Sequence, residues 1–140
     1  MVISLLLLAV TVLFLISMLH VYWACGGSWG SKVVLPVKKG EQEPVFIPQK
    51  TGTLLVAFLL LVAAFLLYMQ GIYLQSMQKF AFLTLGCAVC AVIFFIRAIG
   101  DFKYIGFFKK IKHSQFARND TWFYSPLCLL LAAMYLFVLI

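Results

Sequence analysis

The chain has 140 residues, of which 65% are hydrophobic, and its mean hydropathy is +1.09. Soluble domains are usually about 45–50% apolar, and a water-soluble chain of this length would need a larger core than it can enclose. The composition therefore indicates a multi-pass membrane protein, and the few long apolar blocks predict one domain over residues 1–140.

The formal net charge of +7 is concentrated in two connecting segments, 25–51 and 100–121, which hold nine of the 11 Lys and Arg residues. Because short cytoplasmic loops are rich in Lys and Arg, we expect both segments in the cytoplasm and both termini outside. The clustering favours a bacterial inner-membrane protein that contacts the bilayer and its anionic lipid head groups. It gives no indication of nucleic-acid binding.

Four apolar segments are long enough to cross a bilayer, which takes about 20 helical residues. The predicted spans are 2–24, 52–70, 79–99 and 121–140. They predict an all-α membrane protein, an antiparallel bundle of four transmembrane helices. The apolar residues scattered through 25–51 predict that this connection folds back on the bundle.

The fourth span contains Pro126, which interrupts a regular helix. A helix from Pro126 to Ile140 would be about 22 Å long, whereas the hydrocarbon core is roughly 30 Å thick. We therefore expect the helix to begin near Thr121, with Asp120 as its N-cap and a kink at Pro126. The alternative is a start at Pro126 with Ser125 as the cap.

Polar and aromatic side chains gather at the predicted cytoplasmic ends of the spans. They are His20, Trp23, Trp29, Arg97, Asp101, Asp120 and Tyr124. A charged residue at the end of an apolar span either faces a partner or extends to the head groups. For Arg97 the expected partner is Asp120, or Asp101 if the third helix continues through Gly100.

We predict that these residues line one pocket open to the cytoplasm or the inner leaflet. His20 and Asp120 are the candidate catalytic residues, because histidine exchanges protons near neutral pH. Arg97, Asp101 and Tyr124 would bind the ligand, with Trp23 and Trp29 as walls. Each residue also has a structural explanation, as a head-group contact, a helix cap, an internal hydrogen bond or an interfacial aromatic.

The cysteines allow a different interpretation. Cys87 and Cys90 are three residues apart and share a helical face, as in membrane enzymes that pass electrons from thiols to quinones. Such enzymes also need a second cysteine pair in an exposed loop. In the predicted topology Cys25 and Cys128 lie across the membrane from the first pair. No Cys/His spacing predicts a metal site, and the sequence indicates no cofactor.

The segment 102–112 alternates aromatic and basic residues. Read as a helix, it places Tyr104 and Phe107 mostly on one side and Lys103 and Lys109 largely on the other. This pattern predicts a surface helix whose aromatic face lies among the head groups, or else an aromatic cover over the mouth of the bundle.

Several motifs resemble a family of short four-span bacterial membrane proteins that is filed as a domain of unknown function. They are His20-x-Tyr22-Trp23, Gly26-Gly27-x-Trp29-Gly30, Arg97-Ala98-x-Gly100-Asp101-Phe102, Phe116-Ala117-x-x-Asp120-Thr121 and Tyr124-Ser125-Pro126-Leu127-Cys128. The resemblance covers nearly the whole chain. It implies four spans and supplies no activity.

The leading functional hypothesis is a binding site for a small molecule or a lipid, used by an enzyme or a transporter. Transport would need a homodimer, because four helices enclose little aqueous space. The competing hypothesis is a structural or accessory membrane subunit without a ligand. The thiol oxidoreductase is a third alternative.

Overall fold

The computed structural model describes residues 2–30, 34–35, 48–73, 80–110 and 114–140. Its helical elements are α1 (Val2–Ala24), α3 (Lys50–Tyr73), α4 (Ala81–Ile99), α5 (Gln115–Asn119), the π-helical η1 (Asp120–Tyr124) and α6 (Ser125–Phe137). In the described part of the chain, four helices are long and apolar enough to cross a membrane, and the fourth runs through α5, η1 and α6. The prediction of an all-α, multi-pass membrane protein is confirmed. Most of the connection predicted to fold back on the bundle lies outside the described residues.

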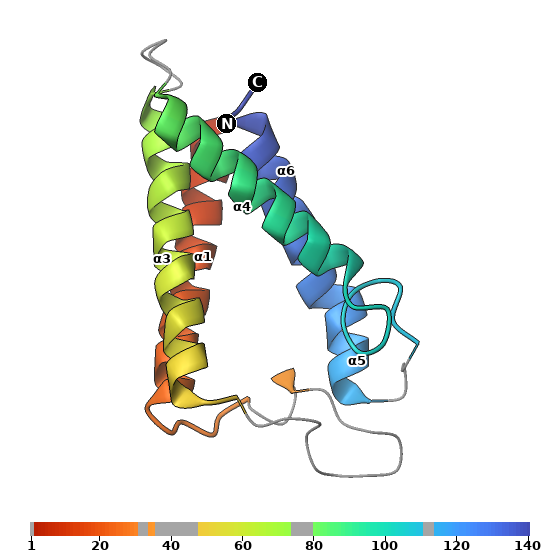
Figure 1. Ribbon diagram of the computed structural model, residues 1–140. Helices are drawn as coiled ribbons and strands as arrows, with labels where there is room; N and C mark the ends of the chain where they lie inside the picture. The colour runs from red at the N-terminus through yellow and green to blue at the C-terminus, as the bar shows by residue number, and fades with distance from the viewer. Residues whose placement is uncertain (1, 31–33, 36–47, 74–79, 111–113) are drawn as a thin grey trace.

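The four spans form two antiparallel pairs, α1 with α3 and α4 with α6. In Figure 1 the pairs lie against each other where α1 begins and α6 ends, and they diverge toward the other end. We call the end where α1 begins and α6 ends the terminal end. The opposite end, which leads into the two basic connections, is called the basic end.

The hydrophobic core lies toward the terminal end, where buried polar groups bond to backbone carbonyls of neighbouring helices. The Tyr135 hydroxyl of α6 donates to the Ala63 carbonyl of α3 at 2.7 Å. Gln70 Nε2 of α3 donates to the Val138 carbonyl at 3.3 Å, just beyond α6. Such bonds between membrane helices are worth about 0.6 kcal/mol on average. Together with the packing around them, they join the two helix pairs at this end.

The fourth span begins earlier than the sequence indicates. Ser114 caps α5, and its side chain accepts a hydrogen bond from the Ala117 amide. Asp120 has helical dihedral angles (φ −65°, ψ −42°), so its predicted role as N-cap is wrong. The span Gln115–Phe137 has 23 residues, which makes it about 34 Å long and sufficient for a bilayer core.

A π-helical turn directly precedes α6, where the sequence predicts a kink at Pro126. Proline has no N–H, and its ring clashes with the carbonyl four residues earlier, here that of Trp122. In η1 the Ser125 amide donates to the Asp120 carbonyl, five residues back. The wider turn makes room for the proline ring and continues the helix.

The predicted surface helix over 102–112 is wrong for its described part, because residues 101–110 form turns and bends. We call residues 100–110 the interhelix loop. Gly100 and Gly106 close it, with φ of 90° and 87°. A Cβ atom on Gly100 would lie 1.8 Å from the Ile105 carbonyl oxygen, so only glycine fits this approach.

Candidate functional site: a buried ion cluster at the basic end

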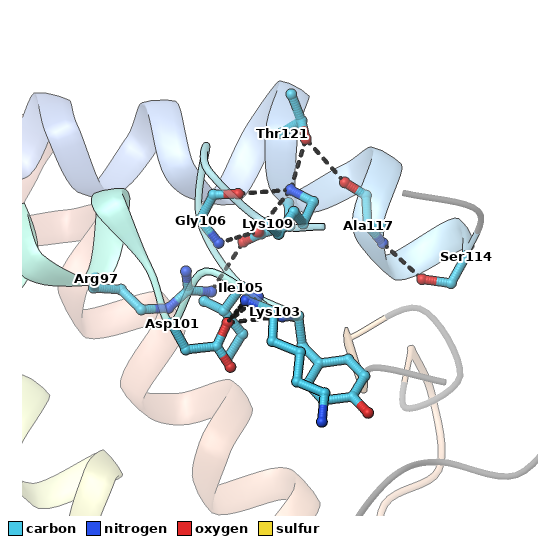
Figure 2. A network of polar contacts seen from close by, with 11 residues as sticks. Arg97, Asp101, Lys103, Ile105, Gly106, Lys109, Ser114, Ala117 and Thr121 are labelled. Atoms are coloured by element: carbon cyan, nitrogen blue, oxygen red, sulfur yellow. Dashed lines mark hydrogen bonds and ion pairs between the residues drawn. The ribbon is translucent and has the colours of Figure 1, made fainter. Parts of the chain in front are cut away.

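Asp120 is the centre of an ion cluster that we define as Arg97, Lys109, Asp120 and Thr121. Figure 2 labels Arg97, Lys109 and Thr121. The Asp120 side chain is fully buried. Its Oδ1 accepts a hydrogen bond from Arg97 Nη2 at 3.0 Å. Its Oδ2 accepts from Lys109 Nζ at 3.0 Å and from the Gly106 amide at 2.6 Å. One carboxylate therefore joins α4, the interhelix loop and η1.

Lys109 is fully buried, and all three of its ammonium protons have acceptors. Nζ donates to the Gly106 carbonyl at 2.9 Å, to Asp120 Oδ2 at 3.0 Å and to Thr121 Oγ1 at 2.6 Å. Thr121 Oγ1 donates in turn to the Ala117 carbonyl at 3.1 Å. A buried lysine is tolerated only when it is paired and hydrogen-bonded. Lys109 has no donor left for a ligand, so its contacts are structural.

Arg97 differs from Lys109 because it is partly accessible. It lies in the last turn of α4, and 34% of its side-chain surface is exposed. Nη2 bonds to Asp120, whereas Nη1 is buried without a partner in the described part of the chain. Two cations share one carboxylate, so the cluster has a net charge of +1. Of the two cations, Arg97 is the one whose side chain keeps exposed surface.

Asp101 was one of two predicted partners of Arg97, and the structure selects the other, Asp120. Because α4 ends at Ile99, Asp101 is not on the helix that carries Arg97. Its Oδ1 instead accepts hydrogen bonds at 2.7–2.9 Å from three backbone amides, those of Lys103, Tyr104 and Ile105. Partial burial alone would raise the pKa of Asp101, but these hydrogen bonds outweigh it and lower the pKa below its ordinary value.

Tyr124 is half-buried and lies on η1, four residues after Asp120. Its ring centroid is 6.2 Å from that of Phe116 and 5.8 Å from that of Phe123. Tyr124 therefore borders the ion cluster from within the fourth span.

His20, Trp23 and Trp29 form a separate group at the end of α1. His20 Nδ1 is 2.8 Å from the Ile16 carbonyl of its own helix, and its ring meets Trp23 edge to face at 5.3 Å. Trp23 Nε1 donates to the Trp29 carbonyl at 2.8 Å. Among the described residues no hydrogen bond or ion pair joins this group to Arg97 or Asp120. The two groups belong to different helix pairs, which diverge at this end (Figure 1).

The structure thus brings together part of the predicted pocket. Arg97 and Asp120 are bonded to each other, Tyr124 lies on the same π-helical turn as Asp120, and Asp101 lies on the interhelix loop that follows α4. Lys109 and Thr121 were not among the site residues predicted from the sequence. Lys109 stands in a run of basic residues, and its position in that run gives no sign of burial. Gly100 and Gly106, which close the interhelix loop around Lys109, are the one sequence feature that could have indicated its burial.

A cavity of about 360 Å³ lies on the other helix pair. It is lined by residues of α1 and α3: Val10, Thr11, Phe14, Leu61, Ala64, Phe65 and Tyr68. The lining is mostly apolar and lies within the spans, so this cavity is not the predicted polar pocket. In the described residues no group of three or more His, Cys, Asp or Glu side chains could hold a metal ion.

The chain matches no curated protein and no solved structure. Residues 13–135 match the family described as "Protein of unknown function (DUF3995)". The match includes every residue of the ion cluster and of the aromatic group at the end of α1. It spans most of the 140 residues, and the chain therefore belongs to the DUF3995 family.

Proposed function

We propose that this protein is a bacterial inner-membrane protein that binds the anionic group of a lipid or a small molecule at Arg97. In the proposed topology the basic end faces the cytoplasm and both termini lie outside. The observation that carries the proposal is the unequal charge of the ion cluster. Two cations meet one buried carboxylate, and the cation that keeps exposed surface is Arg97.

Asp120 prepares Arg97 for such a ligand. A guanidinium group has five N–H donors in a rigid plane, and it can bind a carboxylate and a phosphate at the same time. The bond from Nη2 to Asp120 fixes the orientation of the side chain. Binding an anion at Arg97 would then cost little conformational entropy, because the Arg97 side chain is already ordered. The buried Nη1 still lacks an acceptor, which also favours a further partner for this group.

The same contacts favour binding over acid–base chemistry at Asp120. Both carboxylate oxygens already accept hydrogen bonds from charged or backbone donors. Taking up a proton would break at least one bond to a cation. The predicted catalytic roles of His20 and Asp120, and any use of the site for transport by a homodimer, stay predictions.

A second candidate function is a structural or accessory subunit without a ligand. It is favoured by Lys109, whose three donors are all used within the chain. On this account the ion cluster only holds the interhelix loop against the fourth span. The two candidates differ in what Arg97 does beyond its bond to Asp120.

Lipid retention during purification separates the candidates. The wild type and Arg97→Gln would be extracted in a mild detergent, and their bound lipids and anions compared by native mass spectrometry. We expect Arg97→Gln to lose about fivefold in affinity for phosphatidylglycerol, because one cation near an anionic surface is worth about 1 kcal/mol. Titration with inorganic phosphate distinguishes a free anion from a head group. Lys50→Gln, an exposed cation at the start of α3 that lies outside both the cluster and the interhelix loop, is the matched control.

Equal retention by the wild type and Arg97→Gln, with both variants helical and monodisperse, would contradict the binding proposal. It would leave the structural candidate in its place. A loss of lipid that is just as large in Lys50→Gln would also contradict it, because the effect would then belong to basic charge in general.

A further inference from the structure

The interhelix loop presents large aromatic side chains outside the spans. Phe102 is 57% exposed and Phe108 is 65% exposed, and their ring centroids are 6.3 Å apart. Exposed apolar residues are expected on the spans, where they face lipid. On a loop beyond the end of a span they need a different explanation, because in water they would be costly.

The loop is held in one shape. The Phe107 amide donates to the Ala98 carbonyl at 3.0 Å, and the Gly106 amide donates to Asp120 Oδ2 at 2.6 Å. The carboxylate of Asp101 ties down the backbone amides that follow it (Figure 2). The exposure of the two phenylalanines is therefore built into the fold.

Phe102 also has an unfavourable backbone conformation. Its φ is +60°, and no other non-glycine residue in the described part of the chain has a positive φ. This region favours glycine, and it costs free energy for a side chain with a Cβ atom. A large aromatic residue is present where the backbone alone would select glycine, which indicates that the ring has a use.

Exposed cations outnumber acids on the interhelix loop. Lys103 and Lys110 are exposed on the same loop, and Arg118 is exposed on α5. Lys103 Nζ lies 5.2 Å from the centre of the Tyr104 ring. The one acid of the loop, Asp101, opposes this charge, and its Oδ1 accepts hydrogen bonds from three backbone amides of the loop. The surface thus combines apolar rings with positive charge, as in segments that bind anionic membrane surfaces.

We propose that the interhelix loop docks on anionic lipid head groups of the bilayer that the protein itself spans. Phe102 and Phe108 insert at the boundary between head groups and acyl chains, and Lys103, Lys110 and Arg118 contact lipid phosphates. The membrane is the occupant because the loop follows directly on α4, whose span ends at Ile99. This anchor is independent of the site at Arg97, since it uses different side chains.

Depth measurements in nanodiscs test the anchor. A fluorescent label would be attached at Phe108→Cys in a Cys25→Ser background, and in parallel at Lys110→Cys as the control. Doxyl-labelled lipid and aqueous iodide would be used as quenchers, in phosphatidylcholine with and without phosphatidylglycerol. We expect the label at position 108 to be quenched by lipid and protected from iodide, and the label at 110 to be reached by iodide. Iodide access at 108 equal to that at 110, in both lipids, would overturn the proposal and leave the aromatic pair for a protein partner.

Phe102→Gly is the second variant, because glycine accepts the positive φ and should leave the loop intact. We expect it to keep the fold while the label at 108 becomes more accessible to iodide. Lys103→Gln and Lys110→Gln should each lower the preference for phosphatidylglycerol about fivefold. Unchanged accessibility in Phe102→Gly, together with an unchanged lipid preference in the lysine variants, would refute the anchor even if position 108 were shielded.

Discussion

Replacing Lys109 by methionine tests whether the ion cluster holds the basic end together. The Lys109 and Asp120 side chains have no exposed surface and are 3.0 Å apart. Methionine keeps most of the apolar stem but removes the charge and its three hydrogen bonds. Asp120 would remain buried, with Arg97 and the Gly106 amide as its donors.

Breaking a buried ion pair by removing one partner costs about 3–5 kcal/mol. Because Asp120 keeps one cation, we expect Lys109→Met to fall at the lower end, near 3 kcal/mol, which is about 150-fold in the unfolding equilibrium. The free energy of unfolding would be measured by reversible denaturation in mixed micelles, followed by circular dichroism. Lys103→Met is the control, since an exposed lysine should change stability by less than about 0.5 kcal/mol.

A double variant separates the ion pair from general packing damage. In Lys109→Met with Asp120→Leu, both buried charges of the pair are gone, and Arg97 can turn toward water. We expect the double variant to be less destabilised than the sum of the two single variants, by about 0.5–3 kcal/mol. Wild-type stability in Lys109→Met would refute the reasoning, and so would strict additivity in the double variant.

Three further predictions concern other parts of the fold. The pKa of Asp101 in the folded protein lies below its ordinary 3.8. Its contribution to stability is therefore present above pH 3.8 and is lost as the pH falls through the folded-state pKa. Amide exchange in the interhelix loop should speed up over that pH range, and Asp101→Ala should abolish this pH dependence. Tyr135→Phe removes the 2.7 Å bond to the Ala63 carbonyl and should cost about 0.6–1.7 kcal/mol in micelles, whereas no loss would mean that the bond adds nothing. Maleimide labelling in membranes should modify the exposed Cys25 quickly and leave the buried Cys87 unmodified; rapid labelling of Cys87 would instead favour the thiol oxidoreductase.

The sequence predicted the spans well because long apolar runs have few alternatives in a chain this short. The fourth span shows where the pattern was insufficient. Its helix begins at Gln115, within a polar stretch, because Ser114 supplies a cap there. The π-helical turn before Pro126 depends on how the helix accommodates the proline ring, and composition does not encode that choice.

Only part of the candidate site could be predicted from the sequence. The cost of an unpaired arginine at the end of a span pointed to a carboxylate, and Asp120 is that carboxylate. The burial of Lys109 results from the tertiary path of the interhelix loop, which a helical reading of 102–112 hid. The separation of His20 from Arg97 results from the divergence of the helix pairs (Figure 1), and charge-based topology assigns only the side of the membrane.

An experimental structure in nanodiscs that contain phosphatidylglycerol would test the central claim most directly. We predict Arg97 bonded to Asp120 Oδ1 near the present 3.0 Å, with density for an anionic group against its guanidinium. Arg97 directed into the lipid chains, away from a solvated Asp120, would contradict both the ion cluster and the binding site built on it.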